Sequence, residues 1–454
     1  MSLTSAFSAP QKKLLRYRWV VFCAQVSGMA VIFFVWALPA TIGQDLANEW
    51  QLSATALGFL GSFLFYLYAL MQIPSGYLSD TWGPRRTVTT ALLVMALGQV
   101  IFSLATGLEL ALLGRGITGI GTSLILIAVL KILVNWFRTR EFATLVGITT
   151  LVGFAGAILA TAPLAFVVLQ WGWRPPLLAV GLITFVLALL NWVLVRDDPR
   201  ELGLPPISEL DPGALVPVTR KISEVKGLKL VRRAFQTWRS TVPAWGFSFI
   251  VFLGYGSVQA FQFLWAGSYL INVHQMSLVE AGNSLWLLSL GGGLSPLLSG
   301  YLSDKVVRAR RPFLIAGTLG VSVGWLAILV TTGGASIAFI DATFLLLGFS
   351  GGLILIGQAM VKEAVTSEMF GTVFGIANMF PFLGNALFQL LIGLILTATA
   401  ATASDGTQIY TANAYLFAFL PALVASIGAV VLALFVPETL KRALAAAMSV
   451  AEKV

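Results

Sequence analysis

The sequence predicts an all-α membrane protein whose twelve transmembrane helices form two six-helix bundles, related by a pseudo-twofold axis along the membrane normal. Three observations lead to this prediction. The composition is too apolar for a soluble domain, short bursts of basic residues separate pairs of long apolar runs, and the motif GYLSD occurs at Gly76–Asp80 and again at Gly300–Asp304.

The composition places most of the protein surface in lipid. Of the 454 residues, 58% are hydrophobic and only 10% are charged, whereas a soluble domain carries about 25% charged residues. The net charge of +9 is distributed along the chain, which argues against a nucleic-acid-binding domain. A single cysteine, Cys23, excludes an internal disulfide and cysteine-based metal sites. We expect no metal and no other cofactor.

Twelve apolar runs reach the length of about 20 residues that a membrane-spanning helix needs. Only helices and closed barrels span lipid, and these runs are about twice as long as a barrel strand. The runs of the first half lie near residues 18–40, 55–78, 87–106, 110–134, 142–169 and 176–195. Those of the second half lie near residues 243–271, 281–302, 313–332, 338–361, 370–398 and 413–436.

The segment between the two halves is rich in proline and charge and cannot cross a bilayer. We therefore expect an N-terminal bundle at 1–195, a cytoplasmic linker at 196–240, and a C-terminal bundle with a short cytoplasmic tail at 241–454. Near Lys226–Arg239 the linker either forms an amphipathic helix on anionic lipid headgroups or remains a solvated tether.

The basic bursts also predict the orientation. They follow every second apolar run, as the excess of Lys and Arg in cytoplasmic loops requires. Both termini and the linker are then cytoplasmic, in a multi-pass protein of the cell (inner) membrane. We expect a monomer in contact with membrane lipids.

The repeat predicts that the two halves have the same orientation. Because each half has six crossings, both copies of GYLSD lie on the same face of the membrane. A second pair, FATLVGI at 142–148 and FGTVFGI at 370–376, starts the fifth helix of each half. Two like-oriented six-helix repeats are related by an axis along the membrane normal.

The GYLSD motif predicts a conformational-switch loop at the end of the second helix. Gly76 permits close packing, Asp80 ends the helix, and Gly83 supports a tight turn. Asp80 faces either the neighbouring arginines or the positive N-terminus of a helix from the other half. The loop comprises Gly76, Asp80, Gly83, Arg85 and Arg86, with Gly300 and Asp304 in its second copy.

The stretch GYLSDTWGPRR resembles the loop signature of the major facilitator superfamily, and RGITGIGTS, which contains Arg115, resembles a second signature of that family. GWRPP and VPETLKR are also similar to family patterns. The stretch from Leu38 to Asp80 looks like the organic anion:cation symporter branch. The chain departs from the loop pattern at Thr81, where the family usually has a basic residue, and at Val307, which replaces a glycine.

Polar residues inside the membrane are costly, so we expect them to face a cavity between the halves. Tyr255, Gln259, Gln262 and Tyr269 have the spacing of one helix face. The alternative is that such residues only join neighbouring helices by hydrogen bonds. The predicted solute site comprises Tyr255, Gln259, Gln262, Asn283, Trp286, Asn378, Asn385, Gln389 and Gln25.

Few charged residues lie within the spans. The resemblance implies a coupling or structural role for Arg115. Proton coupling requires a buried carboxylate. Asp341 and Glu363 are candidates, as are Asp45 and Glu141, although all four lie near span ends, where a carboxylate is often solvated or caps a helix.

The function that follows is secondary active transport of a small polar solute by alternating access. The resemblance implies an organic anion, with a proton or another cation as the coupling ion. Helices one and seven lack arginine, which keeps open a neutral solute resembling a sugar or an amino acid, or an efflux carrier. A transporter-like sensor is an alternative from another class. An enzyme is not expected, because one histidine, one cysteine and no mid-span carboxylate pair leave no catalytic constellation.

Overall fold

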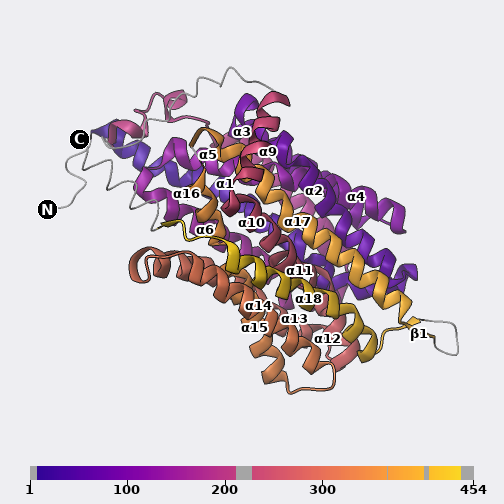
Figure 1. Ribbon diagram of the computed structural model, residues 1–454. Helices are drawn as coiled ribbons and strands as arrows, with labels where there is room; N and C mark the ends of the chain where they lie inside the picture. The colour runs from indigo at the N-terminus through magenta and orange to yellow at the C-terminus, as the bar shows by residue number, and fades with distance from the viewer. Residues whose placement is uncertain (1–7, 211–227, 366, 403–407, 441–454) are drawn as a thin grey trace.

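The computed structural model describes residues 8–210, 228–365, 367–402 and 408–440. The surroundings of Gly76 and of the Asp80 side chain lie outside what it describes. The predicted twelve spans are confirmed, because the described residues include twelve helices that are long and apolar enough to cross a membrane. They form one elongated bundle (Figure 1).

The first half contains six spans, two of which are interrupted. A break after Ser123 divides the fourth span, and a break after Leu159 divides the fifth. The helices are α1 (Ala9–Trp50), α2 (Ala54–Trp82), α3 (Pro84–Ser103), α4 (Leu108–Ser123), α5 (Ile125–Trp136), α6 (Thr139–Leu159), α7 (Ala162–Trp171) and α8 (Arg174–Leu194).

The segment between the halves holds the short helices η1 (Pro199–Leu202) and η2 (Ile207–Leu210), and the amphipathic helix α9 (Leu228–Ser240). The short amphipathic helix considered near Lys226–Arg239 is thus present as α9. Its Ala234 and Trp238 are buried, whereas Arg232, Arg233 and Arg239 are exposed. We call the end of the bundle that carries this segment the linker side, and the opposite end, where α1 ends, the far side.

The second half also contains six spans, and its first span is not a regular α-helix. The elements are α10 (Val242–Ile250), η3 (Val251–Tyr255), α11 (Gly256–Ala260), η4 (Phe261–Trp265), α12 (Ala266–His274), α13 (Leu278–Tyr301), η5 (Leu302–Val306), α14 (Arg311–Thr331), α15 (Ile337–Ile354), α16 (Gly357–Ala364), α17 (Ser367–Ala398) and α18 (Ala412–Phe435). The segments η3, η4 and η5 are π-helical.

One departure from an all-helical chain lies on the far side. Strands β1 (Ala401–Thr402) and β2 (Gln408–Ile409) pair antiparallel between α17 and α18, with Ala401 opposite Ile409. They sit at the corner of the bundle in Figure 1. Two residues a strand are too few to change the fold class.

Side-chain hydroxyls start several helices on the far side. Ser53, Ser277, Ser336 and Thr411 each accept a hydrogen bond from a backbone N–H in the first turn of α2, α13, α15 and α18. The first turn of a helix has N–H groups without a helical partner, and a Ser or Thr cap satisfies one of them. These caps fix where four of the spans begin.

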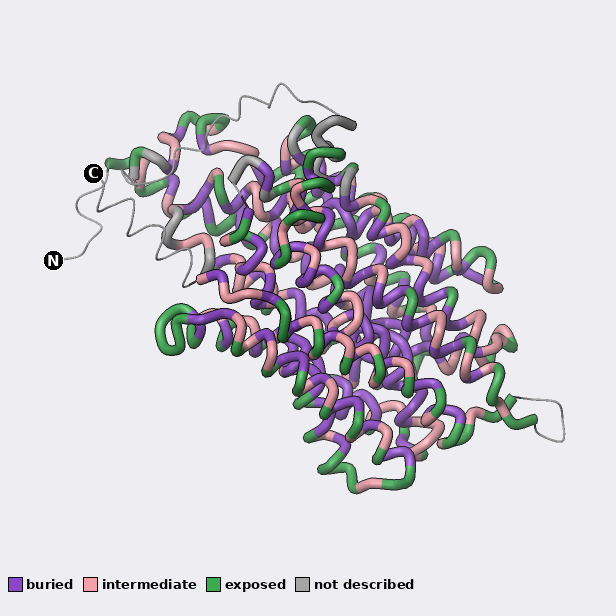
Figure 2. Tube along the Cα trace, viewed as in Figure 1, coloured by how far each residue is buried: buried purple, intermediate pink, exposed green. Residues whose placement is uncertain are grey.

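The apolar core consists of two clusters. One is drawn mainly from residues 14–207 and also includes Phe263, Phe382 and Ala386; the other is drawn mainly from residues 234–436 and also includes Ala40, Ala54 and Leu57. Buried residues run continuously through the bundle in Figure 2. The residues that belong to the cluster of the opposite half lie where α1 and α2 meet the seventh and eleventh spans. There α17 packs along α2. The interface between the halves is therefore itself part of the core.

Candidate solute-binding site

The far side of the interface between the halves is closed by hydrogen bonds. The backbone N–H of Ala54 donates to the hydroxyl of Tyr410 over 2.8 Å. The backbone N–H of Thr55 donates to Thr397 Oγ1 over 2.9 Å, and the two threonine hydroxyl oxygens are also 2.9 Å apart. The first bond joins the start of α2 to the segment between β2 and α18, and the others join it to the end of α17.

Glycines make this closure tight. Gly58, Gly61, Gly267, Gly282 and Gly393 each face an atom of the opposite half so closely that an added methyl group would overlap it. At Gly267 the atom is the carbonyl oxygen of Ala40, and at Gly58 it is the carbonyl oxygen of Gln389. The sequence offered a signal here that our prediction did not use, because Gly58 and Gly61 stand one helical turn apart.

At mid-depth, rings from both halves form what we call the aromatic cluster: Trp36, Phe65, Tyr68, Phe263 and Phe382. The ring centroids of Tyr68 and Phe382 are 4.0 Å apart, and those of Trp36 and Phe382 are 5.4 Å apart. All five side chains are buried. Sequence reasoning selected Tyr68, as a polar residue of the second helix, but not the other four, since aromatic residues are common in apolar spans.

Toward the linker side, the two halves are joined by the amides of Asn378 and Gln72. Asn378 Nδ2 donates to Gln72 Oε1 over 3.4 Å, which is the one described hydrogen bond between the halves on this side of the aromatic cluster. The far side is therefore the more tightly closed of the two.

The seventh span carries two of the predicted glutamines beside the cluster. Gln259 and Gln262 are buried, and Gln262 Nε2 donates to Ser289 Oγ in α13 over 3.0 Å. Tyr255 is partly buried on the same span. Tyr269 departs from the expected face, because its hydroxyl contacts Thr331 in α14 and His274. The π-helical segments η3 and η4 explain this, since each changes the phase of a regular helix.

In the eleventh span, Asn385 and Gln389 lie together as predicted from their spacing. Gln389 Nε2 donates to Asn385 Oδ1 over 2.8 Å, and both side chains are buried. Trp265 Nε1 donates to the carbonyl oxygen of Gln389 over 3.0 Å, linking the span to η4.

Several buried polar atoms near the cluster have no hydrogen-bond partner. Leaving such an atom unpaired costs about 1–3 kcal/mol, so each calls for an explanation. Gln25, which is fully buried in α1, leaves both amide atoms unpaired. The unpaired atoms on the cluster or within about a turn of its rings are Trp36 Nε1, Gln259 Oε1 and Asn385 Nδ2, and Gln389 Oε1, about two turns from Phe382, is also unpaired.

The structure does not bring Asn283 and Trp286 to the cluster. Both are exposed, on the face of α13 that also exposes Leu294 and Leu297. The opposite face, rich in glycine and serine, is the one that packs against α15. The small residues permit the close approach, and the larger side chains lie on the exposed face.

Arg115 lies within the first half, where 1% of its surface is exposed. Its Nη1 donates to the carbonyl oxygen of Val35 over 3.0 Å, and its Nη2 lies 3.5 Å from that of Gly61. Among the described residues no carboxylate pairs with it. The positive charge therefore lies against the backbone of α1 at Val35 and of α2 at Gly61, with carbonyl dipoles as its partners.

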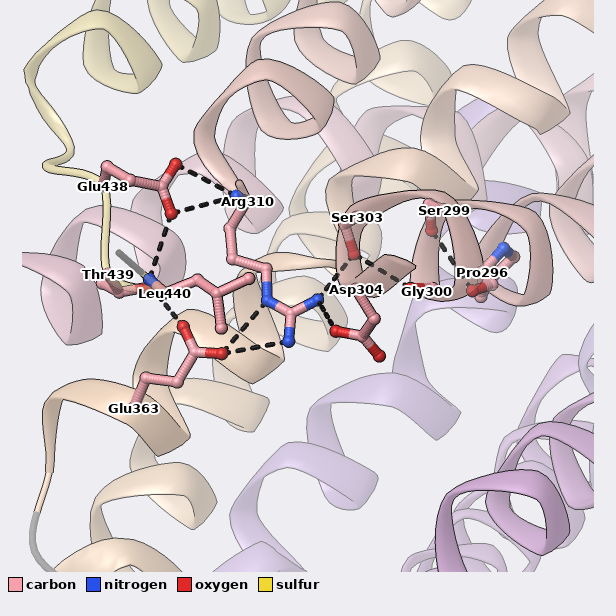
Figure 3. A network of polar contacts seen from close by, with 10 residues as sticks. All are labelled: Pro296, Ser299, Gly300, Ser303, Asp304, Arg310, Glu363, Glu438, Thr439 and Leu440. Carbon is pink, nitrogen blue, oxygen red and sulfur yellow. Dashed lines mark hydrogen bonds and ion pairs between the residues drawn. The ribbon is translucent and has the colours of Figure 1, made fainter. Parts of the chain in front are cut away.

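The second copy of the switch loop forms a charged network on the linker side (Figure 3). Arg310 pairs with Asp304 over 2.6 Å and with Glu363 over 3.0 Å, and Glu363 also accepts from the hydroxyl of Thr439. An added methyl group at Gly300 would meet nothing within 4 Å, so close packing does not explain that glycine. Asp341, the other candidate carboxylate, accepts from Ser284 Oγ.

In the first copy, the turn at Gly83 has a φ of 82°, which favours glycine. The backbone N–H of Arg85 donates to Asp197 Oδ1 over 2.6 Å, and the Arg85 guanidinium donates to the carbonyl oxygen of Trp192. Arg86 is exposed. Burial raises the pKa of Asp197 above its ordinary value, against the effect of the Arg85 bond.

The second half repeats this arrangement with different residues. Glu438 accepts from the backbone N–H groups of Arg310 and Arg311, and the Arg311 guanidinium donates to the carbonyl oxygen of Leu434. Burial acts to raise the pKa of Glu438, but the backbone hydrogen bonds outweigh it and hold the pKa below its ordinary value. In each half, an acid after the last helix thus caps the third helix.

A cavity of about 520 Å³ opens on the far side, between α1, α7 and the start of α13. Asp45 and Glu49 line it, and Glu49 is paired with Arg174 over 2.5 Å. One oxygen of Asp45 is buried without a partner. The acidic lining disfavours an anion here.

Comparison with known proteins identifies the family. The sequence profile of the Major Facilitator Superfamily matches residues 22–389. A probable hexose phosphate transport protein of Chlamydia trachomatis is 27% identical over 403 residues, which cover 85% of this chain and 86% of that protein. The probable galactarate/D-glucarate transporter GarP of Escherichia coli K12 is 24% identical, with 85% of this chain and 90% of that protein covered.

A third relative has a different role. The membrane sensor protein UhpC of Escherichia coli K12 is 26% identical over 372 residues, which cover 79% of this chain and 82% of that protein.

Solved structures share the fold. A bacterial homologue of the human lysosomal transporter Spinster, in an inward-facing and unoccupied conformation, gives a TM-score of 0.72 at 19% identity, over 92% of this chain and 96% of that one. A D-xylose-proton symporter gives 0.70 at 15% identity, over 93% of this chain and 99% of that one. The chain therefore belongs to the Major Facilitator Superfamily, and we assign it transport of a solute rather than catalysis of a reaction.

Proposed function

We propose that the protein is a proton-coupled symporter that moves a small organic anion across the cell (inner) membrane by alternating access. The two halves, 1–195 and 241–454, rock about the site at the aromatic cluster, and the linker 196–240 and both termini are cytoplasmic. The protein acts as a monomer. Relatives named for hexose phosphates and for galactarate or D-glucarate support an anionic solute.

The observation that carries the proposal is the buried charge of Arg115. A charge without a carboxylate partner is costly in the interior, and an anion entering between the halves would offset that cost. At an effective dielectric constant of about 20, two opposite unit charges about 8–10 Å apart attract each other by roughly 2 kcal/mol. Helices one and seven need no arginine of their own if Arg115, on helix four, supplies the electrostatic attraction for the anion.

Replacing Arg115 tests the proposal. In proteoliposomes with an inward proton gradient, we expect uptake of at least one anion from a panel of labelled hexose phosphate, sugar acids and benzoate, and a protonophore should abolish it. Arg115→Gln should lower that uptake at least about tenfold, as a loss of roughly 2 kcal/mol implies.

The matched control is Arg232→Gln, which removes an exposed arginine of α9, outside the switch loop, and should leave uptake within twofold of the parent protein. Gel filtration establishes that both variants are folded. Uptake of neutral sugars with no uptake of anions would instead assign a neutral solute.

For the coupling carboxylate we favour Asp341 over Glu363. Glu363 is held by an ion pair with Arg310, whereas the described partner of Asp341 is the neutral hydroxyl of Ser284. Asp341 therefore binds a proton without breaking an ion pair. Asp341→Asn is expected to retain solute exchange while losing acceleration by the proton gradient. A variant that still responds to the gradient as the parent does would exclude this role.

A second candidate function is solute sensing, which the similarity to a membrane sensor protein favours. A sensor predicts solute-dependent thermal stabilisation of the purified protein with no flux in the same liposomes. Measured uptake excludes it as the sole function.

A further inference from the structure

The aromatic cluster has a feature that binding of a small anion does not by itself require. Phe65 of the first half faces Phe263 and Phe382 of the second half nearly in parallel, with interplanar angles of 11° and 14° and ring centroids 6.1 and 6.4 Å apart. Trp36 and Tyr68 close the sides. Because the facing rings come from opposite halves, the motion that opens the interface also separates them.

Unpaired polar atoms belong to the cluster or to residues near its rings along the chain. Trp36 belongs to the cluster itself, Gln259 precedes Phe263 by one turn, and Asn385 follows Phe382 by one turn. Gln389 is bonded to Asn385. These atoms comprise two N–H donors, on Trp36 and Asn385, and two acceptors, on Gln259 and Gln389, all buried. Such atoms suit a solute with a few polar substituents at one edge.

We propose that the solute is an anion built on a planar ring, an aromatic monocarboxylate, with the ring between Phe65 and the rings of the second half. This inference rests on the proposed function. Aromatic rings gain from offset stacking and edge-to-face contacts with one another. The carboxylate takes the free donors of Trp36 and Asn385, and its single charge matches that of Arg115.

A sugar acid fits this site less well. It carries an oxygen atom on nearly every carbon, and each oxygen loses its bonds to water when it is buried. The four unpaired atoms cannot satisfy them all, and the faces of the slot are apolar. A diacid would also bring two negative charges to one buried arginine. An organic cation suits aromatic rings in general, but the charge of Arg115 repels it.

The experiment measures binding to the purified full-length protein by calorimetry. Benzoate should bind at least tenfold more tightly than cyclohexanecarboxylate, which has the same charge and ring size but no aromatic faces, and more tightly than galactarate or a hexose phosphate. This comparison needs no variant, so a folding defect cannot affect it. Equal affinity for benzoate and cyclohexanecarboxylate, or tighter binding of the sugar acids, overturns the inference.

A pair of variants adds a second readout. Phe382→Leu removes a ring of the slot but keeps an apolar side chain, and should weaken benzoate binding at least tenfold. Phe380→Leu, two residues away on α17, removes a ring that instead packs on Trp238 and Phe249, and should leave binding unchanged. Equal effects of the two substitutions would mean that the cluster is only packing.

The outcomes separate this inference from the proposed function. Proton-driven uptake of sugar acids without binding of benzoate would overturn the inference and leave symport standing. Benzoate binding without flux of any anion would support the inference and overturn symport. Failure of every organic anion to bind would overturn both.

Discussion

A disulfide between cysteines at positions 55 and 397 is expected to stop transport almost completely, and a reductant should restore it. Thr55 and Thr397 belong to opposite halves, and their hydroxyl oxygens are 2.9 Å apart. Sulfur atoms in the same positions lie close to the distance of about 2.05 Å that a disulfide requires. Once the bond forms, the far side cannot open, so the solute cannot reach its site from there. Uptake before and after oxidation measures the effect.

The chain is well suited to this test because Cys23 is its single cysteine, so Cys23→Ser provides a background free of other thiols. The single variants Thr55→Cys and Thr397→Cys are the controls, and oxidation should leave both active. Full activity of the cross-linked protein would contradict alternating access at this interface.

The second large effect is expected at Gly267. A methyl group there would overlap the carbonyl oxygen of Ala40 across the interface, and a backbone atom cannot move aside as the end of a flexible side chain can. Gly267→Ala should therefore hold the far side open and lower uptake at least about tenfold. A cysteine at position 397 should at the same time become more reactive toward a membrane-impermeant maleimide.

Gly107 provides the matched control for this substitution. It also lies on the far side, its φ of −174° is open to any residue, and an added methyl group meets nothing within 4 Å. Gly107→Ala should transport like the parent protein. If Gly267→Ala did so as well, the close contact with Ala40 would not be part of the transport cycle.

The number of spans was predictable because the bilayer imposes their length and apolarity, and the doubled arrangement was predictable because the GYLSD motif recurs. A span must satisfy its own backbone hydrogen bonds and remain apolar over about 20 residues, so its signal is local and strong. The boundaries were less predictable. For example, α1 extends from Ala9 to Trp50, well beyond the apolar run at 18–40, because polar residues at its ends continue the helix outside the apolar zone.

The candidate site was only partly predictable, for a geometric reason. Regular spacing placed Gln259 and Tyr269 on one face, but the intervening π-helical segment η4 turns Tyr269 toward α14. Residue spacing gives no warning of a π segment, because tertiary packing decides whether one forms. The pair Asn385 and Gln389 lies on an uninterrupted helix, α17, and there the spacing predicted their contact.

Contacts between distant spans were beyond sequence reasoning. Nothing in the run around Trp36 indicates that it meets Phe263 and Phe382 of the other half. Asn283 and Trp286 show the opposite case, since residues predicted to line a polar site are exposed and have no contact with the aromatic cluster among the described interactions. In each case the helix face that is buried depends on which other span packs against it. The sequence of one helix does not show which span that is.

The paired caps show how the duplicated halves have diverged. Asp197 and Glu438 differ in side-chain length, and the stretches RDDPREL and VPETLKR share few letters, yet each acid binds the backbone at the start of the third helix of its own half. The two halves thus share this hydrogen-bonding pattern although their sequences differ here. A search for internal repeats by sequence identity alone would not detect that Asp197 and Glu438 are equivalent.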